Sequence, residues 1–194
     1  MGVIIMKKAI RLFCILSLIT LAVGCSSFDE GDAKKVAEKF VRGIYTVDAE
    51  KVAKFSIPIP APTGDPLSEE YANEYGDAVL KNMKLVDKNV LPLMTSEGYQ
   101  SIITNQFNSV STGICAKGNY TAQITDLTLG ENVYKDYKDE GKIRYRYEVK
   151  MKFISSDGKG EQADASAGAV ELLKENGQWK VCLYDINQFP KLYK

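Results

Sequence analysis

The alternating pattern of residues 142–154 constrains the fold of this chain more than any other feature. Its odd-numbered positions are apolar or aromatic, whereas nearly all of its even-numbered positions are charged. Successive side chains of a β-strand point to opposite faces, so the pattern predicts a long antiparallel strand with one buried and one solvated face. The expected buried set is Ile143, Tyr145, Tyr147, Val149, Met151 and Phe153, and the expected solvated set is Lys142, Arg144, Arg146, Glu148, Lys150 and Lys152.

Turn signals predict two further strands after this one. The segment Ser156–Gly160 suits a hairpin connection, and Asn176–Gly177 suits a tight turn with positive φ. The strand between these turns, Gln162–Leu173, has a face of small residues, which we expect the protein's own helices to contact: Ala163, Ala165, Ala167 and Ala169. In the last strand, Gln178–Ile186, the residues expected to point inward are Trp179, Val181 and Leu183.

The chain before residue 142 changes from a helical period to a strand period. Tyr120–Leu129 is expected to be a strand with a bulge near Thr125–Asp126, because its inward set shifts there by one position. Val133–Tyr137 could add a short edge strand. Apolar spacing predicts helices over Asp32–Tyr45, Ala49–Phe55, Ser68–Val90 and Ser96–Phe107, an irregular proline-rich segment at 57–66 and a loop over Asn108–Asn119. This order predicts an α+β fold in which N-terminal helices pack on a curved antiparallel sheet, in one domain of residues 32–194.

The first 24 residues have the composition of an export signal. Lys7, Lys8 and Arg11 precede an apolar run, Leu12–Val23, that is shorter than the ~20 residues a membrane-spanning helix needs. The segment ending in Gly24–Cys25 resembles the lipobox of bacterial lipoproteins, in which the cysteine is acylated and becomes the mature N-terminus.

That resemblance implies a signal peptide at 1–24, a palmitate-type lipid on Cys25 and a short tether over 25–31. It also implies a lipid-anchored location at the extracytoplasmic face of the cell membrane. The alternative is an uncleaved transmembrane anchor.

Composition excludes several classes of function. Removal of residues 1–24 takes away three basic residues and no acidic one, so the formal charge falls from 0 to −3 and offers no basic footprint for nucleic acid. The chain has no histidine, which excludes histidine-based triads and histidine-ligated zinc. Asp136, Asp139 and Glu140 cluster but lack the spacing of a calcium loop, so we expect a solvated turn, no metal site and no cofactor.

Two cysteines, Cys115 and Cys182, remain beyond the lipobox. In an exported protein they could form a disulfide, or they could be two buried small apolar residues. Geometry decides between these alternatives, because the sequence does not show whether the two residues meet.

Three motifs resemble the nuclear transport factor 2-like superfamily, the cone-shaped α+β fold shared with ketosteroid isomerase. They are the helix-turn-helix Tyr45–Val52, the run Leu93–Tyr99 followed by Asn105, and the closing hairpin Leu172–Val181, which is similar to small secreted Gram-positive members. The resemblance covers about Asp32 to Tyr184 and implies a cone with an interior cavity. The superfamily hosts enzymes, binding modules and scaffolds, so the fold implies no single function.

Candidate chemistry centres on the expected inward face. Tyr145, Tyr147 and Trp179 are candidates to line the cavity, with Asp126 and Asp185 near strand ends. None of these residues maps onto the catalytic positions of the isomerase branch, so no catalytic or cofactor-binding residue is assigned. The cationic face of residues 142–152 could contact anionic headgroups or wall polymers, or it could simply be a solvated face.

Two functions of different class therefore stand side by side. The first is a non-catalytic binding domain held at the cell surface, with an envelope protein as partner. The second is a binder of a small apolar ligand, or an isomerase-like enzyme, that uses the cone cavity. A cavity filled by side chains would favour the first, and a deep cavity with an unpaired acid would favour the second.

Overall fold

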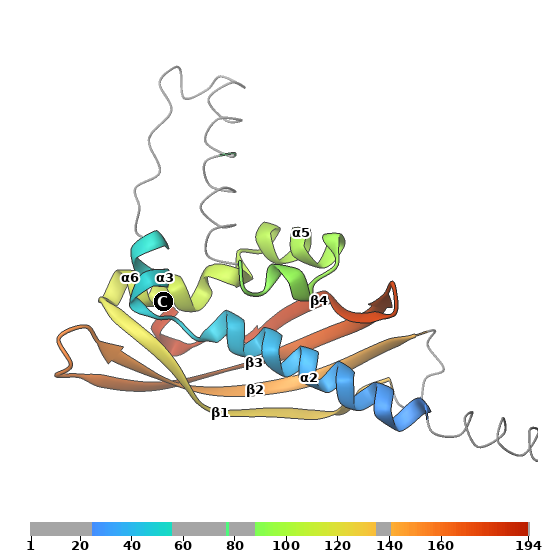
Figure 1. The fold of residues 1–194 in the computed structure, drawn as a ribbon. Helices are drawn as coiled ribbons and strands as arrows, with labels where there is room; N and C mark the ends of the chain where they lie inside the picture. Colours follow the sequence, from blue (N-terminus) through green and yellow to red (C-terminus); the bar gives the residue numbers. More distant parts are fainter. Residues whose placement is uncertain (1–24, 56–76, 78–87, 135–140, 194) are drawn as a thin grey trace, which may run out of the picture.

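The computed structural model describes residues 25–55, 77, 88–134 and 141–193, with side chains from residue 30 onward. In this part of the chain helices come first and a sheet follows (Figure 1). The helices are α2 (Cys25–Tyr45), α3 (Ala49–Phe55), α5 (Ser96–Thr104) and α6 (Val110–Gly118), with the 3₁₀ turns η1 (Leu91–Leu93), η2 (Phe107–Ser109) and η3 (Lys191–Tyr193). The strands are β1 (Tyr120–Asn132), β2 (Lys142–Ser155), β3 (Glu161–Glu175) and β4 (Gln178–Gln188).

The four strands form one antiparallel sheet in the order β1-β2-β3-β4. The sheet is curved and open, and the helices lie over one of its faces (Figure 1). Helix α2 contacts all four strands, α5 packs on β4 and α6 packs on β1. The predicted α+β architecture, helices packed on a curved antiparallel sheet, is therefore confirmed.

Strand β2 has the predicted inner and outer faces. Its apolar set is buried, from Val149 at 0% exposed to Ile143 at 9%, and forms the centre of the core. The charged set faces the side of the sheet opposite the helices. We call this side the outer face, and the helix-covered side the inner face.

Helix α2 packs its apolar stripe on the inner face, as its spacing predicts. Ala33, Ala37, Phe40, Val41 and Ile44 are all buried. The helix begins at Cys25 rather than at Asp32, so the backbone of residues 25–31 is helical. The carboxylate of Asp48 accepts a hydrogen bond from the Lys51 amide at 2.7 Å, which caps the N-terminus of α3.

The predicted loop over Asn108–Asn119 is wrong, because this segment forms η2 and α6. Its small and β-branched residues have weak helix propensity, but five of them are buried, and tertiary packing outweighs propensity. Asn119 ends the helix in the left-handed conformation, φ 56°, and its amide donates to the Cys115 carbonyl.

Bulges set the register at both edges of the sheet. The predicted bulge in β1 is confirmed, since its register with β2 shifts between Ile124 and Asp126. Strand β4 also shifts its register with β3, at Cys182, and this shift was not predicted. It turns Leu183 to the outer face opposite Glu171, which corrects its predicted inward position, and it buries Tyr184 and Ile186 instead.

The alanine row of β3 also lies on the outer face, so the prediction that the protein's own helices contact it is wrong. Ala165 and Ala167 pair with Lys150 and Glu148 of β2, whose side chains are solvated. The inner positions of β3 are Ser166, Gly168, Val170 and Leu172.

Other predicted elements fall partly or wholly outside the described residues. Val133 and Tyr134 form a turn and not an edge strand. Lys88–Val90, the end of the predicted helix Ser68–Val90, is also a turn, whereas Asp77 within that helix is helical. The other residues of that helix, the proline-rich segment 57–66, residues 135–140 and the signal at 1–24 lie outside the described residues.

Candidate functional site

Three tyrosine hydroxyls meet on the inner face where a cone-type cavity was expected. Tyr45 of α2, Tyr147 of β2 and Tyr184 of β4 lie within hydrogen-bond distance of one another, at 2.8–3.1 Å. Ser166 of β3 bonds to Tyr45 at 2.7 Å and donates to the Gln188 carbonyl at 2.7 Å. We call these four residues the tyrosine cluster.

The tyrosine cluster is closed to solvent and internally satisfied. Each of its side chains is at most 1% exposed, and the rings of Tyr147 and Tyr184 stack with centroids 5.6 Å apart. Burial raises the pKa of all three tyrosines, so they stay protonated and neutral at physiological pH. Among the described residues no carboxylate bonds to the cluster.

Gly168 makes this packing fit. A Cβ at this position would lie 2.7 Å from the Tyr147 hydroxyl and would also meet the Asp185 carbonyl. The close approach of a tyrosine ring to the β3 backbone therefore requires glycine.

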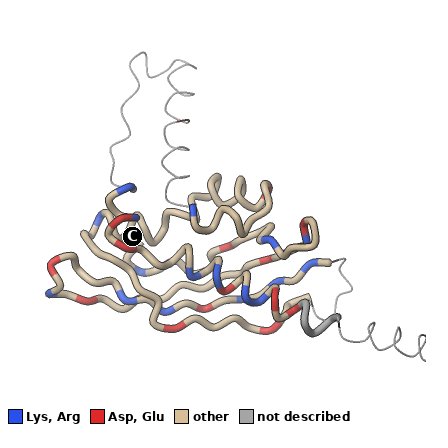
Figure 2. The backbone as a smooth tube through the Cα atoms, viewed as in Figure 1, with Lys and Arg blue, Asp and Glu red and all other residues tan. Residues whose placement is uncertain are grey.

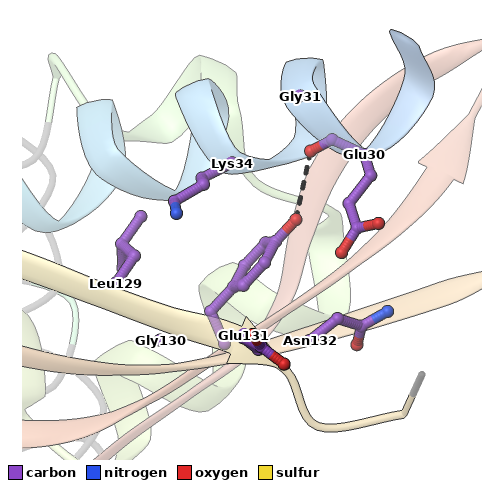
Figure 3. A pocket seen from close by; sticks show the side chains of 8 residues that line it. Glu30, Gly31, Lys34, Leu129, Gly130, Glu131 and Asn132 are labelled. Carbon is purple, nitrogen blue, oxygen red and sulfur yellow. Dashed lines mark hydrogen bonds between the residues drawn. The ribbon is translucent and has the colours of Figure 1, made fainter. Parts of the chain in front are cut away.

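Tyr145 lies two residues from Tyr147 on the same face but lines a different space. A pocket of about 480 Å³ opens between the start of α2 and the end of β1, and we call it the α2–β1 pocket (Figure 3). Its lining residues are Glu30, Gly31, Lys34, Leu129, Gly130, Glu131, Asn132 and Tyr145. Tyr145 donates to the Glu30 carbonyl at 3.1 Å, and burial, together with the nearby Glu30 charge, raises the pKa of Tyr145 to about 12.

An irregularity in β1 explains why the pocket exists. Register with β2 is interrupted between Leu129 and Asn132, so Gly130 and Glu131 leave the regular ladder. The side-chain oxygen of Asn132 then accepts from the amides of Tyr134 and Arg144, at 3.0 and 3.2 Å, and fixes the end of the strand.

Trp179 is not part of either tyrosine site. It lies at the start of β4, is half-buried against the core, and has the Lys174 ammonium 5.4 Å from its ring centroid. Of the three candidate pocket residues, the structure thus places Tyr145 in the α2–β1 pocket, Tyr147 in the tyrosine cluster and Trp179 beside the last hairpin.

A second pocket, of about 390 Å³, lies along α5 and was not predicted. It is lined mainly by apolar side chains: Leu91, Met94, Thr95, Ser96, Tyr99, Gln100 and Ile103. We call this pocket the groove along α5. The amide of Thr95 donates to the Val181 carbonyl at 3.0 Å, which holds one edge of the groove against β4.

The outer face is not a positive patch. Most of the β2 cations pair with acids on neighbouring strands, and blue and red segments lie side by side along the sheet (Figure 2). Lys150 pairs with Asp126 at 3.2 Å and Lys152 pairs with Glu161 at 2.7 Å. Arg146 is the β2 cation that forms no ion pair with the described residues.

Glu171 is the buried centre of the outer-face charges. Its side chain is 7% exposed. The carboxylate accepts a hydrogen bond from the Tyr134 hydroxyl at 2.7 Å and forms ion pairs with Arg144 at 3.2 Å and Lys142 at 3.3 Å. Arg144 also pairs with Asp185 at 2.9 Å. Burial alone would raise the pKa of Glu171, but these three partners lower it below its usual range. Asp126 and Asp185 are therefore outer-face ion-pair residues, on the opposite side of the sheet from the tyrosine cluster.

Cys115 and Cys182 are free thiols in the structure, and Cys115 is buried whereas Cys182 is half-buried. Burial raises the pKa of Cys115 to about 12, and burial with the Glu171 charge raises that of Cys182 to about 11. Both thiols are protonated at neutral pH and are poor nucleophiles.

No group of three or more histidine, cysteine, aspartate or glutamate side chains among the described residues is placed to hold a metal ion. No helix within those residues is long and apolar enough to span a membrane.

Comparison with known proteins shows only distant similarity of fold. No family model matches the chain, and no curated protein matches it. An IcmL-like type IV secretion system protein from Legionella pneumophila is 11% identical, with a TM-score of 0.43 over 79% of this chain and 88% of that one. The protein Aln2 from a Streptomyces species is 12% identical, with a TM-score of 0.38 over 62% of this chain and 92% of that one. Similarity at this level carries no information on function.

Proposed function

We propose that this chain is a lipid-anchored binding domain at the extracytoplasmic face of the cell membrane, and that it does not catalyse a reaction. The anchor is Cys25, because a basic segment, an apolar run and small residues precede it in the order of a lipoprotein signal. Two or more acyl chains hold a protein stably on a bilayer, so the domain needs no membrane-spanning helix.

We assign the domain to the nuclear transport factor 2-like type. The order of its elements supports this, since a long helix, a capped short helix and a four-stranded meander follow one another as in that superfamily. The Asp48 cap at the turn between α2 and α3 falls within the motif that carries the resemblance.

The tyrosine cluster is the observation that favours binding over catalysis. Its hydroxyls satisfy one another, its rings fill the inner face, and no described carboxylate reaches it. An isomerase-like site needs a base and an oxyanion donor that face an open cavity, whereas here the tyrosines are donors and acceptors to each other.

The outer face is the surface that we propose for an envelope protein partner. It carries the exposed Arg146 and Glu148 beside the small side chains of β3, so a partner can approach the backbone closely while charges orient it. The described helices leave this face uncovered (Figure 1). A small apolar ligand would instead fit the groove along α5, whose lining is mainly apolar.

Detergent phase partitioning of the cellular protein tests the anchor. The wild-type chain should enter the detergent phase and carry the mass of acyl chains on Cys25. Cys25→Ser should remove both properties. Equal partitioning of the two forms, with residues 1–24 retained, would mean that the chain is a transmembrane anchor and that the proposal is wrong.

A pull-down from envelope extracts tests the partner surface. Arg146→Glu should weaken partner capture, whereas Lys159→Glu, in the exposed β2–β3 turn, serves as the matched charge reversal and should not. Turnover of a small carbonyl compound that is lost in Tyr147→Phe would instead support an enzyme.

A further inference from the structure

The α2–β1 pocket lies near the proposed anchor. Glu30, on its α2 wall, is five residues after Cys25 within one continuous helix. At a rise of 1.5 Å per residue, their backbones are about 8 Å apart along the helix axis. If Cys25 carries the lipid, the pocket lies at the depth of the polar headgroups.

The charges of this pocket differ from those of the outer face. Glu30 and Lys34 from α2 and Glu131 from β1 have charged side chains without a hydrogen bond or ion pair to any described residue. On the outer face, by contrast, four of the five β2 cations are paired. Charges that line one pocket and pair with no described residue can bond to a ligand.

The two carboxylates and one ammonium of the pocket suit a ligand that carries both an ammonium group and an anionic group. Glu30 lies on the α2 wall of the pocket and Glu131 on the β1 wall, and neither carboxylate bonds to a described residue, so both can accept from a ligand cation (Figure 3). Lys34 supplies the opposite charge on the α2 wall, one helical turn from Glu30. The Asn132 oxygen is already bonded to backbone amides, which leaves its NH₂ group as a further donor.

We propose that the α2–β1 pocket binds the aminoethyl phosphate headgroup of a phospholipid. The ligand ammonium bonds to Glu30 and Glu131, and the ligand phosphate pairs with Lys34. A pocket of about 480 Å³ is within the size range of small-molecule sites and is large enough for this headgroup. A choline headgroup has no N–H to donate, and a glycerol headgroup has no cation, so both should bind less well. This inference rests on the membrane attachment proposed above.

Equilibrium binding to the full chain in detergent micelles tests the proposal. The probes are soluble phosphoethanolamine and phosphocholine, followed by phosphatidylcholine vesicles with and without phosphatidylethanolamine. We expect about tenfold preference for the ethanolamine form, since hydrogen bonds to a charged group discriminate on that scale. Glu131→Gln and Glu30→Gln should reduce the preference to about twofold or less, and Lys34→Gln should weaken both phosphate probes equally.

Glu175→Gln is the matched control, because Glu175 is exposed at the end of β3, outside the pocket, and its replacement should leave the preference unchanged. Equal binding of phosphoethanolamine and phosphocholine by the wild-type chain would overturn the proposal. A preference for phosphoethanolamine that persists in the double variant Glu30→Gln, Glu131→Gln would also overturn it. Thermal unfolding of each variant separates a lost contact from a lost fold.

The outcome is separable from that of the anchor test. A chain that lacks acyl mass at Cys25 but prefers phosphoethanolamine would refute the anchor and retain the pocket. An acylated chain without the preference would do the reverse. Binding of soluble phosphoethanolamine without enrichment on ethanolamine vesicles would identify the free phosphoamine as the ligand and exclude the lipid.

Discussion

Replacement of Arg144 by methionine should destabilise the fold, although Arg144 lies on the solvated face of β2. Its guanidinium bonds to the buried carboxylate of Glu171 and to Asp185, at 3.2 and 2.9 Å. Removal of one partner from a fully buried ion pair costs about 3–5 kcal/mol. The Arg144 side chain is 25% exposed, and Glu171 keeps Tyr134 and Lys142. We therefore expect roughly half of that cost, about 2 kcal/mol.

Urea unfolding followed by the fluorescence of Trp179, the single tryptophan of the chain, measures this change. Arg146→Met is the matched control two residues along the same face, and its effect should stay within about 0.5 kcal/mol. Adding Glu171→Gln to Arg144→Met should recover part of the loss, because no uncompensated buried charge is then left.

The effect of Arg144→Met should also depend on pH. The native pKa of Glu171 is lowered, so its contribution to stability is fully present above the unfolded value of about 4.3 and is lost as pH falls through the native pKa. Wild type and Arg144→Met should therefore converge in acid. Equal losses for Arg144→Met and Arg146→Met at neutral pH would refute the account of Glu171 as a buried centre.

Two further predictions concern the core. Tyr147→Phe should destabilise the fold by about 1–3 kcal/mol, because the hydroxyls of Tyr45 and Tyr184 each lose one hydrogen-bond partner in a site without solvent. Urea unfolding measures the change. An unchanged free energy of unfolding would mean that water enters the cluster. Cys115 and Cys182 should resist a thiol reagent at neutral pH in the native state, since their pKa values are raised to about 12 and 11. Both should react fully in urea, because both are free thiols. Absence of reaction in urea without reductant would indicate a disulfide.

The sequence predicts the centre of the sheet well because apolar and charged residues alternate regularly along β2. In β2 every second residue is apolar, and burial follows that alternation without exception from Ile143 to Phe153. The bulge in β1 is also visible in the sequence, because Ala122 and Leu127 are an odd number of positions apart yet share the inner face. Period alone is sufficient in β2, which pairs with β3 without a register shift.

The candidate site is less predictable because it depends on contacts between distant segments. Tyr184 joins the tyrosine cluster only through the bulge at Cys182, and the regular alternation of Trp179, Val181 and Leu183 hides that shift. Tyr45 looks like the last apolar residue of a helical stripe, and its hydroxyl partner is 102 residues away. The sequence does contain a signal for the buried position of Glu171, since this residue is a lone charge within the apolar run Ala169–Leu173.

Helix α2 has a mechanical consequence through its position across the sheet. It touches β1, β2, β3 and β4, and its stripe from Ala33 to Tyr45 is buried over that whole span. A force applied at Cys25 therefore acts along the helix and is shared among all four strands, in shear, rather than peeling one strand from an edge. A domain loaded in this way should keep its sheet intact while its partner pulls against the membrane.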